Sequence, residues 1–348
     1  LCAAISAAPA QVGSDSVHVS LQPPAGTRLT ATQIDTLQVR QNDGELLASE
    51  RRSTFQVDIS KSSAEGGIAT LELTTVNWDP AGPNFLTTLA MEAALGEAEI
   101  GKVREVRFAP SGKTTGFPAA ADFDRNVFDG FTAYLQKYFD LPSIVKSYGR
   151  RHRVSVAQLA AARYKRARAI AAPKVPDFAG NWLLHTLVFP YSQSVRLGSE
   201  IERAKPLKTV RVIAPTPSKT TLTVTRDSAD PKRLIASFET VYDAAELAKR
   251  VARQQAVAVQ ALFLQRMRQD SSKRAEHEAW ANETMRKMKA AARQTRVDRT
   301  RVVIDADSGW PVTFETTNVE TTQGIRYDLM TPVVTVFTQG VVIRFSKR

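Results

Sequence analysis

Cysteine is almost absent from this chain of 348 residues, which contains only Cys2. A single cysteine cannot form an intramolecular disulfide or build a clustered thiolate site for zinc or iron. If the residues before Gln11 are removed, no cysteine remains. The sequence therefore excludes a disulfide-stabilised scaffold, and we expect no chemistry that depends on a thiol.

Long apolar runs are also missing. No stretch of about 18 apolar residues occurs without a charge, so the sequence encodes no membrane-spanning helix. Hydrophobic residues make up 43% of the chain and charged residues 24%, which is typical of folded globular proteins. The length allows either one large antiparallel domain or two ordinary domains.

The first ten residues are mostly small and apolar. Ala8 and Ala10 have the A-x-A spacing that signal peptidases recognise, because only small side chains fit their subsites. We therefore expect a periplasmic or secreted protein, cleaved near Ala10. The alternative is lipid anchoring at Cys2, although Leu1 is larger than the residue expected before a lipidated cysteine.

Motifs that carry catalytic or metal chemistry are missing as well. No G-x-S-x-G sequence frames a serine nucleophile, and no H-E-x-x-H sequence is present. The four histidines are scattered along the chain: His18, His152, His185 and His277. We expect no metal, no cofactor and no enzymatic activity; the alternative is an enzyme whose site has no sequence motif.

Three short segments resemble ligand-binding loops, but each lacks residues that the loop requires. Gly112-Lys113-Thr114 resembles the end of a phosphate-binding loop, but Arg107 occupies the position of its first glycine. The segments 122–126 and 305–309 space their aspartates as a calcium loop does, but both lack its closing glutamate. We expect turns and helix caps at all three.

Positive charge is the distinctive feature of the composition. The net charge is +12 and the pI is 9.9, which favours anionic partners. Residues 146–168 contain eight basic residues and no acidic one. Our candidates for anion or partner binding come from this run: Arg150, Arg151, Arg153, Arg163, Lys165, Arg166 and Arg168. The alternative is that these side chains form a solvated helix face that covers apolar surface.

Alternating apolar residues predict strands over much of the chain. They are expected within 15–76, at 103–108, near Trp182, at 210–213, 220–225, 234–241, 302–304, 312–314, 333–337 and 341–345, with a break at Gln339-Gly340. Spacings of three and four predict helices at 85–95, 124–140 and 155–172.

Residues 243–296 contain neither glycine nor proline and have helical spacing, which predicts a helical hairpin broken near 270–272. This arm carries twelve basic and six acidic residues, a net charge of +6. We therefore predict a β-rich domain, 11–241 and 297–348, with an inserted helical arm, 242–296. We expect the α+β class: a curved antiparallel β-sheet covered by helices, with an inserted α-helical hairpin.

Two stretches carry a resemblance to a group of proteins. Val195-Arg196-Leu197-Gly198-Ser199-Glu200-Ile201 and the hairpin from Val302 to Val312 resemble parts of uncharacterised exported bacterial envelope proteins with a curved antiparallel sheet, which are broadly similar to periplasmic lipoprotein carriers. The resemblance implies a concave sheet that holds an apolar ligand. It supplies no catalytic residue.

Together these features favour a non-enzymatic envelope protein that binds a hydrophobic or anionic component: a lipid, a lipoprotein or a polysaccharide. The basic segments would contact the anion. Nucleic acid is not expected, because the interleaved aromatic residues and clustered cysteines of common nucleic-acid modules are missing. The alternative is an assembly protein whose helical arm docks an envelope protein. The oligomeric state stays open.

Overall fold

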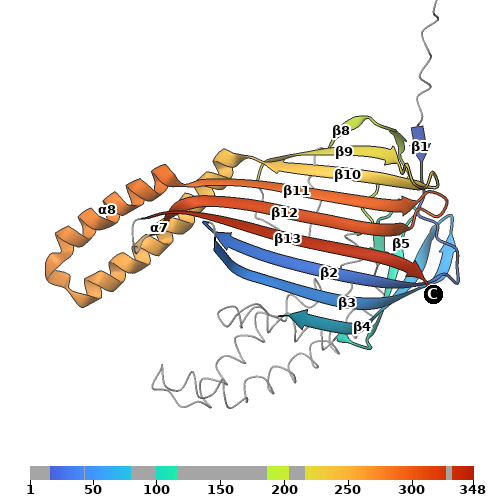
Figure 1. Ribbon diagram of the computed structural model, residues 1–348, viewed down its shortest axis with the longest axis horizontal. Helices are drawn as coiled ribbons and strands as arrows, with labels where there is room; N and C mark the ends of the chain where they lie inside the picture. Colours follow the sequence, from blue (N-terminus) through green and yellow to red (C-terminus); the bar gives the residue numbers. More distant parts are fainter. Residues whose placement is uncertain (1–15, 43, 80–98, 117–185, 204–215, 327–330) are drawn as a thin grey trace, which may run out of the picture.

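The computed structural model describes residues 16–42, 44–79, 99–116, 186–203, 216–326 and 331–348. Within these residues, eleven strands form one antiparallel sheet in the order β6-β5-β4-β3-β2-β13-β12-β11-β10-β9-β8, and β1 pairs separately with β7. Two helices project from one end of the sheet (Figure 1). The predicted α+β class, with a curved antiparallel sheet and an inserted helical hairpin, is confirmed.

Several strands are long, and β3 alone has 20 residues. The first part of the chain contributes β1 (Ser16–His18), β2 (Arg28–Gln41), β3 (Gly44–Ser63), β4 (Gly66–Asp79), β5 (Val103–Phe108), β6 (Thr114–Gly116), β7 (Ser194–Arg196) and β8 (Glu200–Arg203). The second part contributes β9 (Ser218–Arg226), β10 (Arg233–Tyr242), β11 (Arg293–Asp305), β12 (Pro311–Arg326) and β13 (Thr331–Lys347).

The sheet consists of two meanders. Strands β2 to β6 follow one another across one half, and β8 to β13 follow one another across the other half. The halves are joined because β13 pairs with β2, in a register that runs from Thr335↔Gln41 to Lys347↔Leu29. The last strand of the chain therefore lies at the centre of the sheet, beside its first long strand (Figure 1).

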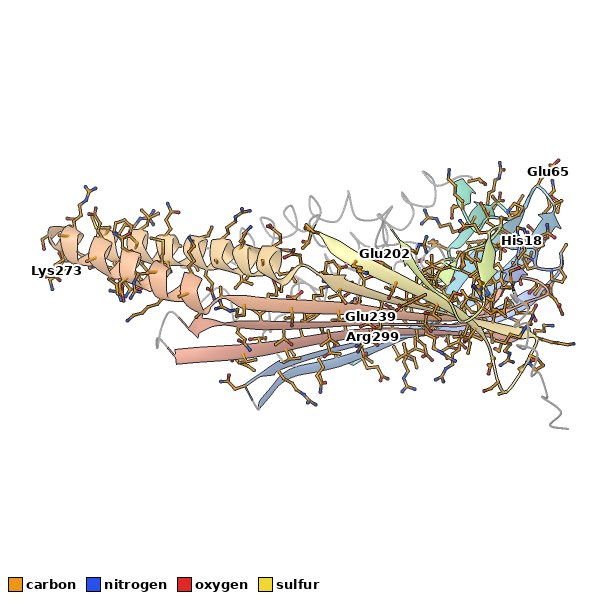
Figure 2. All side chains as sticks on the ribbon, turned by 90° about the horizontal axis from the view of Figure 1, so that it is seen from above. His18, Glu65, Glu202, Glu239, Lys273 and Arg299 are labelled. Atoms are coloured by element: carbon orange, nitrogen blue, oxygen red, sulfur yellow. The ribbon has the colours of Figure 1, made fainter. Side chains whose placement is uncertain are left out.

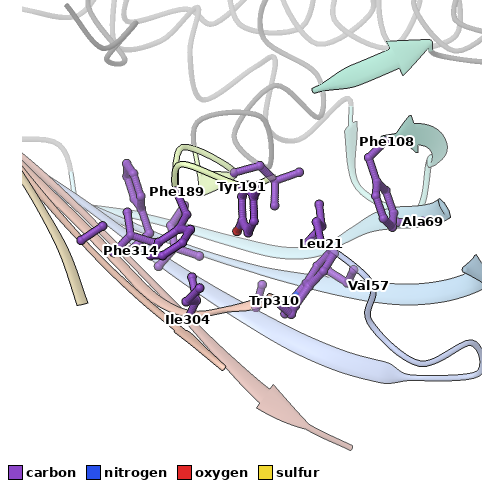
Figure 3. Close-up of a cluster of buried hydrophobic side chains, with 14 of the residues drawn as sticks. Leu21, Val57, Ala69, Phe108, Phe189, Tyr191, Ile304, Trp310 and Phe314 are labelled. Atoms are coloured by element: carbon purple, nitrogen blue, oxygen red, sulfur yellow. The ribbon is translucent and has the colours of Figure 1, made fainter. Parts of the chain in front are cut away.

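Alternating burial gives the sheet two different faces. In β11 every second residue from Gln294 to Ile304 is buried, while the residues between them are mostly exposed. We call the buried side the core face and the opposite side the outer face. At one end of the core face, Ile304, Trp310 and Phe314 pack with Phe189 and Tyr191, which reach the sheet from a loop (Figure 3).

The helices α7 (Ala244–Gln269) and α8 (Arg274–Ala291) form the hairpin, with a 3₁₀ turn, η2 (Ser271–Lys273), between them. Asp243 caps α7 by accepting hydrogen bonds from the amides of Ala245 and Glu246. Asp270 ends α7 in an extended conformation and accepts from the amide of Ser272, so the chain reverses without glycine. Figure 2 shows Lys273 at the hairpin tip, at the opposite end of the molecule from His18.

The structure corrects three predicted boundaries. The arm does not reach Arg296: α8 ends at Ala291, and the chain from Arg293 onward alternates as a strand. The break predicted at Gln339-Gly340 is wrong, because both residues lie inside the continuous strand β13. A Cβ at Gly340 would lie 2.7 Å from Thr36 Oγ1, so the glycine allows close approach of β2.

The third correction concerns the strand predicted to extend to Leu21. Only Ser16–His18 pairs as a strand, whereas Val19 and Leu21 are buried without a ladder. The backbone beyond His18 bonds to separate loops, through Leu21 N to Pro110 O and Gln22 N to Ser308 O. The helices predicted at 85–95, 124–140 and 155–172 and the strands predicted near Trp182 and at 210–213 lie outside the described residues.

Of the three segments that resemble ligand-binding loops, 122–126 lies outside the described residues, and the other two form turns, as predicted. Gly112, at φ +74°, closes the turn between β5 and β6. In the turn between β11 and β12, Asp305 Oδ1 accepts from the amide of Ser308, and Gly309 has φ +68°. A Cβ at Gly309 would overlap the carbonyl oxygen of Ser20, so this glycine fixes where the N-terminal segment crosses the sheet.

We expect Gly309→Ala to be far more destabilising than Gly198→Ala. Gly198 has nearly the same backbone conformation, φ +71°, with nothing within 4 Å of its Cβ position. Gly198→Ala should therefore cost only the left-handed penalty of about 1 to 2 kcal/mol. Gly309→Ala must in addition displace the backbone of Ser20. Urea denaturation of both variants measures the difference; equal losses would contradict this role of Gly309.

Candidate functional site on the core face of the sheet

The basic residues selected from the sequence cannot be placed in a site. Arg150, Arg151, Arg153, Arg163, Lys165, Arg166 and Arg168 lie outside the described residues. The described part of the chain does place the other charge-rich region, the helical arm. Its helices carry ten basic and five acidic residues over 244–291, a net charge of +5.

A buried charged cluster crosses the core face between the apolar core and the helical arm. Arg296 on β11 donates from Nε to Asp298 Oδ1 at 2.7 Å and from Nη2 to Asp298 Oδ2 at 3.1 Å. Both side chains are only 2% exposed. Tyr242 on β10 donates its hydroxyl to Asp298 Oδ2 at 2.8 Å. The carboxylate of Asp298 thus receives hydrogen bonds from two neighbouring strands, which compensate its burial.

The cluster continues onto β12. Arg296 Nη1 lies 3.6 Å from Glu320 Oε2, and Gln294 Nε2 donates to Glu320 Oε1 at 2.6 Å. The guanidinium of Arg296 also lies over the ring of Tyr242, 5.2 Å from its centroid. Burial and the hydrogen bond to Asp298 raise the pKa of Tyr242 above its ordinary value. Its hydroxyl therefore stays protonated at neutral pH and acts as a donor.

Neutral polar side chains extend this cluster into a belt across four strands. Thr220 and Thr240 share a buried hydrogen bond of 2.9 Å between their hydroxyls, and Thr300 and Thr316 share another of 2.9 Å. We call the buried polar side chains on the core face of β9 to β12 the polar belt; they are Thr220, Thr240, Gln294, Arg296, Asp298, Thr300, Thr316 and Asn318.

Among the described residues, the polar belt and strand β2, which β13 separates from β12, contain buried amide oxygens without a hydrogen-bond partner. They are Gln294 Oε1, Asn318 Oδ1 and Gln33 Oε1. The amide nitrogens of Gln294 and Gln33 both donate to carboxylates, of Glu320 and Asp35, so their carbonyl oxygens are left to accept from another group. A buried acceptor without a donor costs about 1 to 3 kcal/mol, which water or a ligand hydroxyl would recover.

On the central strands the core face is more open, and four of its side chains are apolar, beside the polar Thr335 and Gln339. Leu37 and Val39 on β2 and Val333 and Phe337 on β13 are all only partly buried. Val39 lies directly opposite Phe337 in the ladder, so the two belong to one face. We call these four residues the apolar patch. The ion pair between Arg51 Nε and Asp35 Oδ2, at 2.7 Å, separates it from the packed core.

Sequence reasoning missed both parts of this site. Arg296 was expected on the polar arm, because helical composition continues almost to that residue. The signal for a strand was the alternation of Gln294, Arg296 and Asp298, three polar residues that no hydrophobic pattern marks as buried. The apolar patch lies within strands that the sequence predicts, but its side chains meet only because β2 pairs with β13.

No protein-family model matches the chain, and no curated protein matches it. Among solved structures, the chain is similar to lipovitellin, in a structure that describes lipid–protein interactions in that protein. The TM-score is 0.39 with 9% sequence identity, over 94% of this chain and 26% of the lipovitellin chain. This chain thus spans about a quarter of lipovitellin. A likeness at this TM-score transfers neither a fold nor a function.

The described residues contain neither a candidate membrane-spanning helix nor a candidate metal site. No helix there is long and apolar enough to cross a membrane. No group of three histidine, cysteine, aspartate or glutamate side chains there lies close enough together to hold a metal ion.

We expect Asp298→Ala to destabilise the fold by about 3 to 5 kcal/mol, because it leaves the guanidinium of Arg296 buried beside a more distant Glu320. The matched control is Glu239→Ala on β10. Glu239 pairs with Arg299 of β11 at 3.3 Å on the exposed outer face (Figure 2), so its loss should cost less than about 1 kcal/mol. Guanidinium denaturation compares the two; similar costs would mean that the buried cluster contributes no more than a surface pair.

Proposed function

We propose that the chain is a non-enzymatic cell-envelope protein that binds an amphipathic envelope component, with lipid as the best candidate, on the core face of its sheet. The apolar patch carries the proposal. Val39 lies opposite Phe337 in the ladder, and Leu37 and Val333 lie on the same face. All four side chains are partly exposed, whereas the other end of this face is packed and buried. Apolar side chains gathered on a concave, half-open face are typical of a ligand site.

The polar belt supports an amphipathic ligand rather than a purely apolar one. Glu320 of the buried cluster lies directly opposite Phe337 of the apolar patch in the ladder between β12 and β13. Its side chain is 23% exposed, unlike the nearly inaccessible Arg296 and Asp298. A molecule whose tail covers the apolar patch would bring its polar end within reach of this carboxylate and of the amide of Gln294, which bonds to it.

The preference for an anionic component rests on the net charge of +12 and on the basic run 146–168. Export, the absence of catalysis and the envelope location are part of the same proposal, motivated by the A-x-A spacing and the lack of catalytic motifs. Lipoprotein and polysaccharide are the other ligands that the sequence allows.

The test is binding of a dansyl-labelled undecanol to the full chain, measured by the rise in dansyl fluorescence. The hydroxyl of this probe can donate to the carboxylate of Glu320 or to the carbonyl oxygen of Gln294. We expect Val39→Asp and Phe337→Asp to weaken binding at least tenfold, because a carboxylate in the patch must be desolvated by the tail. Val336→Asp is the matched control: it is the neighbour of Phe337 on the same strand and points to the outer face. Its affinity should stay within twofold of the unchanged protein.

Circular dichroism establishes that each variant is folded. If Val336→Asp weakens binding as strongly as Phe337→Asp, the site is not on the core face. If the unchanged protein binds no probe and no lipid co-purifies with it in native mass spectrometry, the proposal is wrong.

Charge preference is measured separately, by co-sedimentation with vesicles of phosphatidylglycerol or phosphatidylcholine. We expect binding to the anionic vesicles alone, at least fivefold weaker in 0.5 M than in 0.05 M salt, because salt screens exposed charges. Equal binding to both vesicles at both salt concentrations would contradict an anionic preference while leaving the apolar site intact.

A further inference from the structure

A groove of about 480 Å³ runs between α7 and α8, away from the core face. Its lining is mainly apolar, with Ala256, Val257 and Phe263 from α7 and Ala281 and Met285 from α8. Below it, Val259, Ala281 and Met288 form a small buried cluster that holds the two helices together. The groove is therefore a feature of a packed helix pair rather than a gap between loose ends.

The rim of the groove exposes apolar surface that the hairpin itself does not cover. Val257 is 68% exposed, and Leu264, two turns further along α7, is 49% exposed. Residues seven positions apart lie on the same face of a helix, so the two side chains form one stripe. Such a stripe beside a concave apolar floor is typical of a surface that receives another helix.

The charges around the groove are unequal at its two ends. Toward the tip, Arg274 is neutralised by Glu278 at 2.8 Å. Toward the sheet, Arg253 lies one helical turn from Val257, and Lys289 lies one turn from Met285. Both are exposed, and neither forms an ion pair with another described residue.

The nearby glutamate cannot compensate these two cations. Glu283 already pairs with Arg286 at 2.8 Å and with Lys287 at 3.4 Å. Its hydrogen bond from Arg286 lowers the pKa of Glu283 to about 2, so it stays ionised and bound to its own partners. The end of the groove near the sheet is thus positively charged.

We propose that this groove docks an acidic, amphipathic helix of a partner protein. The apolar face of that helix would cover Val257 and the floor, and its acidic residues would meet Arg253 and Lys289. A second copy of this chain is a poor occupant of the groove, because two arms of +5 each would repel. A bilayer surface is also a poor occupant, because a concave groove accommodates a convex ridge rather than a flat surface. The site is separate from the core-face patch and does not depend on the proposed function.

The test uses point variants rather than deletion of the arm, because deletion would also remove buried side chains that pack against the sheet. Leu247 and Val251 of α7 are buried where that helix packs against β11. The probes are three fluorescein-labelled, hydrocarbon-stapled 18-residue peptides. One is a helix with Leu at positions i, i+3, i+4 and i+7 and Glu elsewhere on its surface; one carries Lys in place of each Glu; one has the acidic composition in scrambled order.

Fluorescence anisotropy with the full chain should show the acidic amphipathic peptide binding at least tenfold more tightly than the other two. Val257→Asp should weaken it at least tenfold, since that side chain is exposed and its replacement leaves the fold intact. Arg253→Glu combined with Lys289→Glu should also weaken it at least tenfold. The matched control reverses two tip charges, Arg268→Glu with Lys273→Glu, and should leave the affinity within threefold.

Several outcomes overturn the proposal. They are equal affinity for all three peptides, tighter binding of the basic peptide, and equal losses from the two charge reversals. Binding of phosphatidylglycerol vesicles that is lost in Val257→Asp, without binding of the acidic peptide, assigns the surface to a membrane instead. Self-association that is lost in Val257→Asp, measured by analytical ultracentrifugation, assigns it to a second copy. The dansyl probe should bind all these variants equally, which separates this site from the core-face patch.

Discussion

The pairing of β13 with β2 is the constraint on which the rest of the structure depends. It joins two meanders that are each built from neighbouring segments of the chain, and it brings residues about 300 positions apart into one ladder. Without it, each meander would expose a long central edge with unpaired backbone groups. Because this contact is non-local, its loop-closure entropy must be overcome before the sheet is complete, so we expect the joined sheet to fold more slowly than either half.

The same pairing brings the apolar patch together on the core face, which also carries the apolar core and the polar belt. A face built only to stabilise the sheet would continue its apolar packing along the full length of the strands, because buried ion pairs contribute little net stability compared with apolar side chains. Here the Arg296–Asp298 pair and two threonine pairs interrupt it. The cost of burying these groups is understandable if they also orient a ligand.

The helical arm differs from the sheet in what it exposes. Its base is buried against β11 and β12, whereas its distal part has exposed apolar side chains and unequal charge. Arg266 lies over the ring of Trp280, 4.0 Å from its centroid, which ties the two helices together near the tip. A helix pair held in this way presents a preformed surface, so docking a partner would cost little ordering entropy.

Local features of the chain were predictable from sequence because their causes are local. Alternating apolar residues predicted most strands, and the turn at 305–309 follows from the hydrogen bond of Asp305 to the amide of Ser308. The hairpin and its break near Asp270 follow from helix propensity and capping, which act within a few residues. The net positive charge of the arm is likewise a property of the sequence itself.

Tertiary contacts decided the rest. Glycine is typical of turns, but Gly340 lies inside β13. Its missing side chain leaves room for Thr36 of β2, which approaches it closely. The sequence around Arg296 is typical of a surface helix, but Arg296 is a buried residue of a strand. Asp298, Tyr242 and Glu320 surround it from three strands and compensate its charge. The sequence by itself determined both described helices and most of the described strands, since backbone propensity and side-chain alternation are local. Strand pairing decided which faces meet and which charges are buried, because it brings together residues that are separated in the chain.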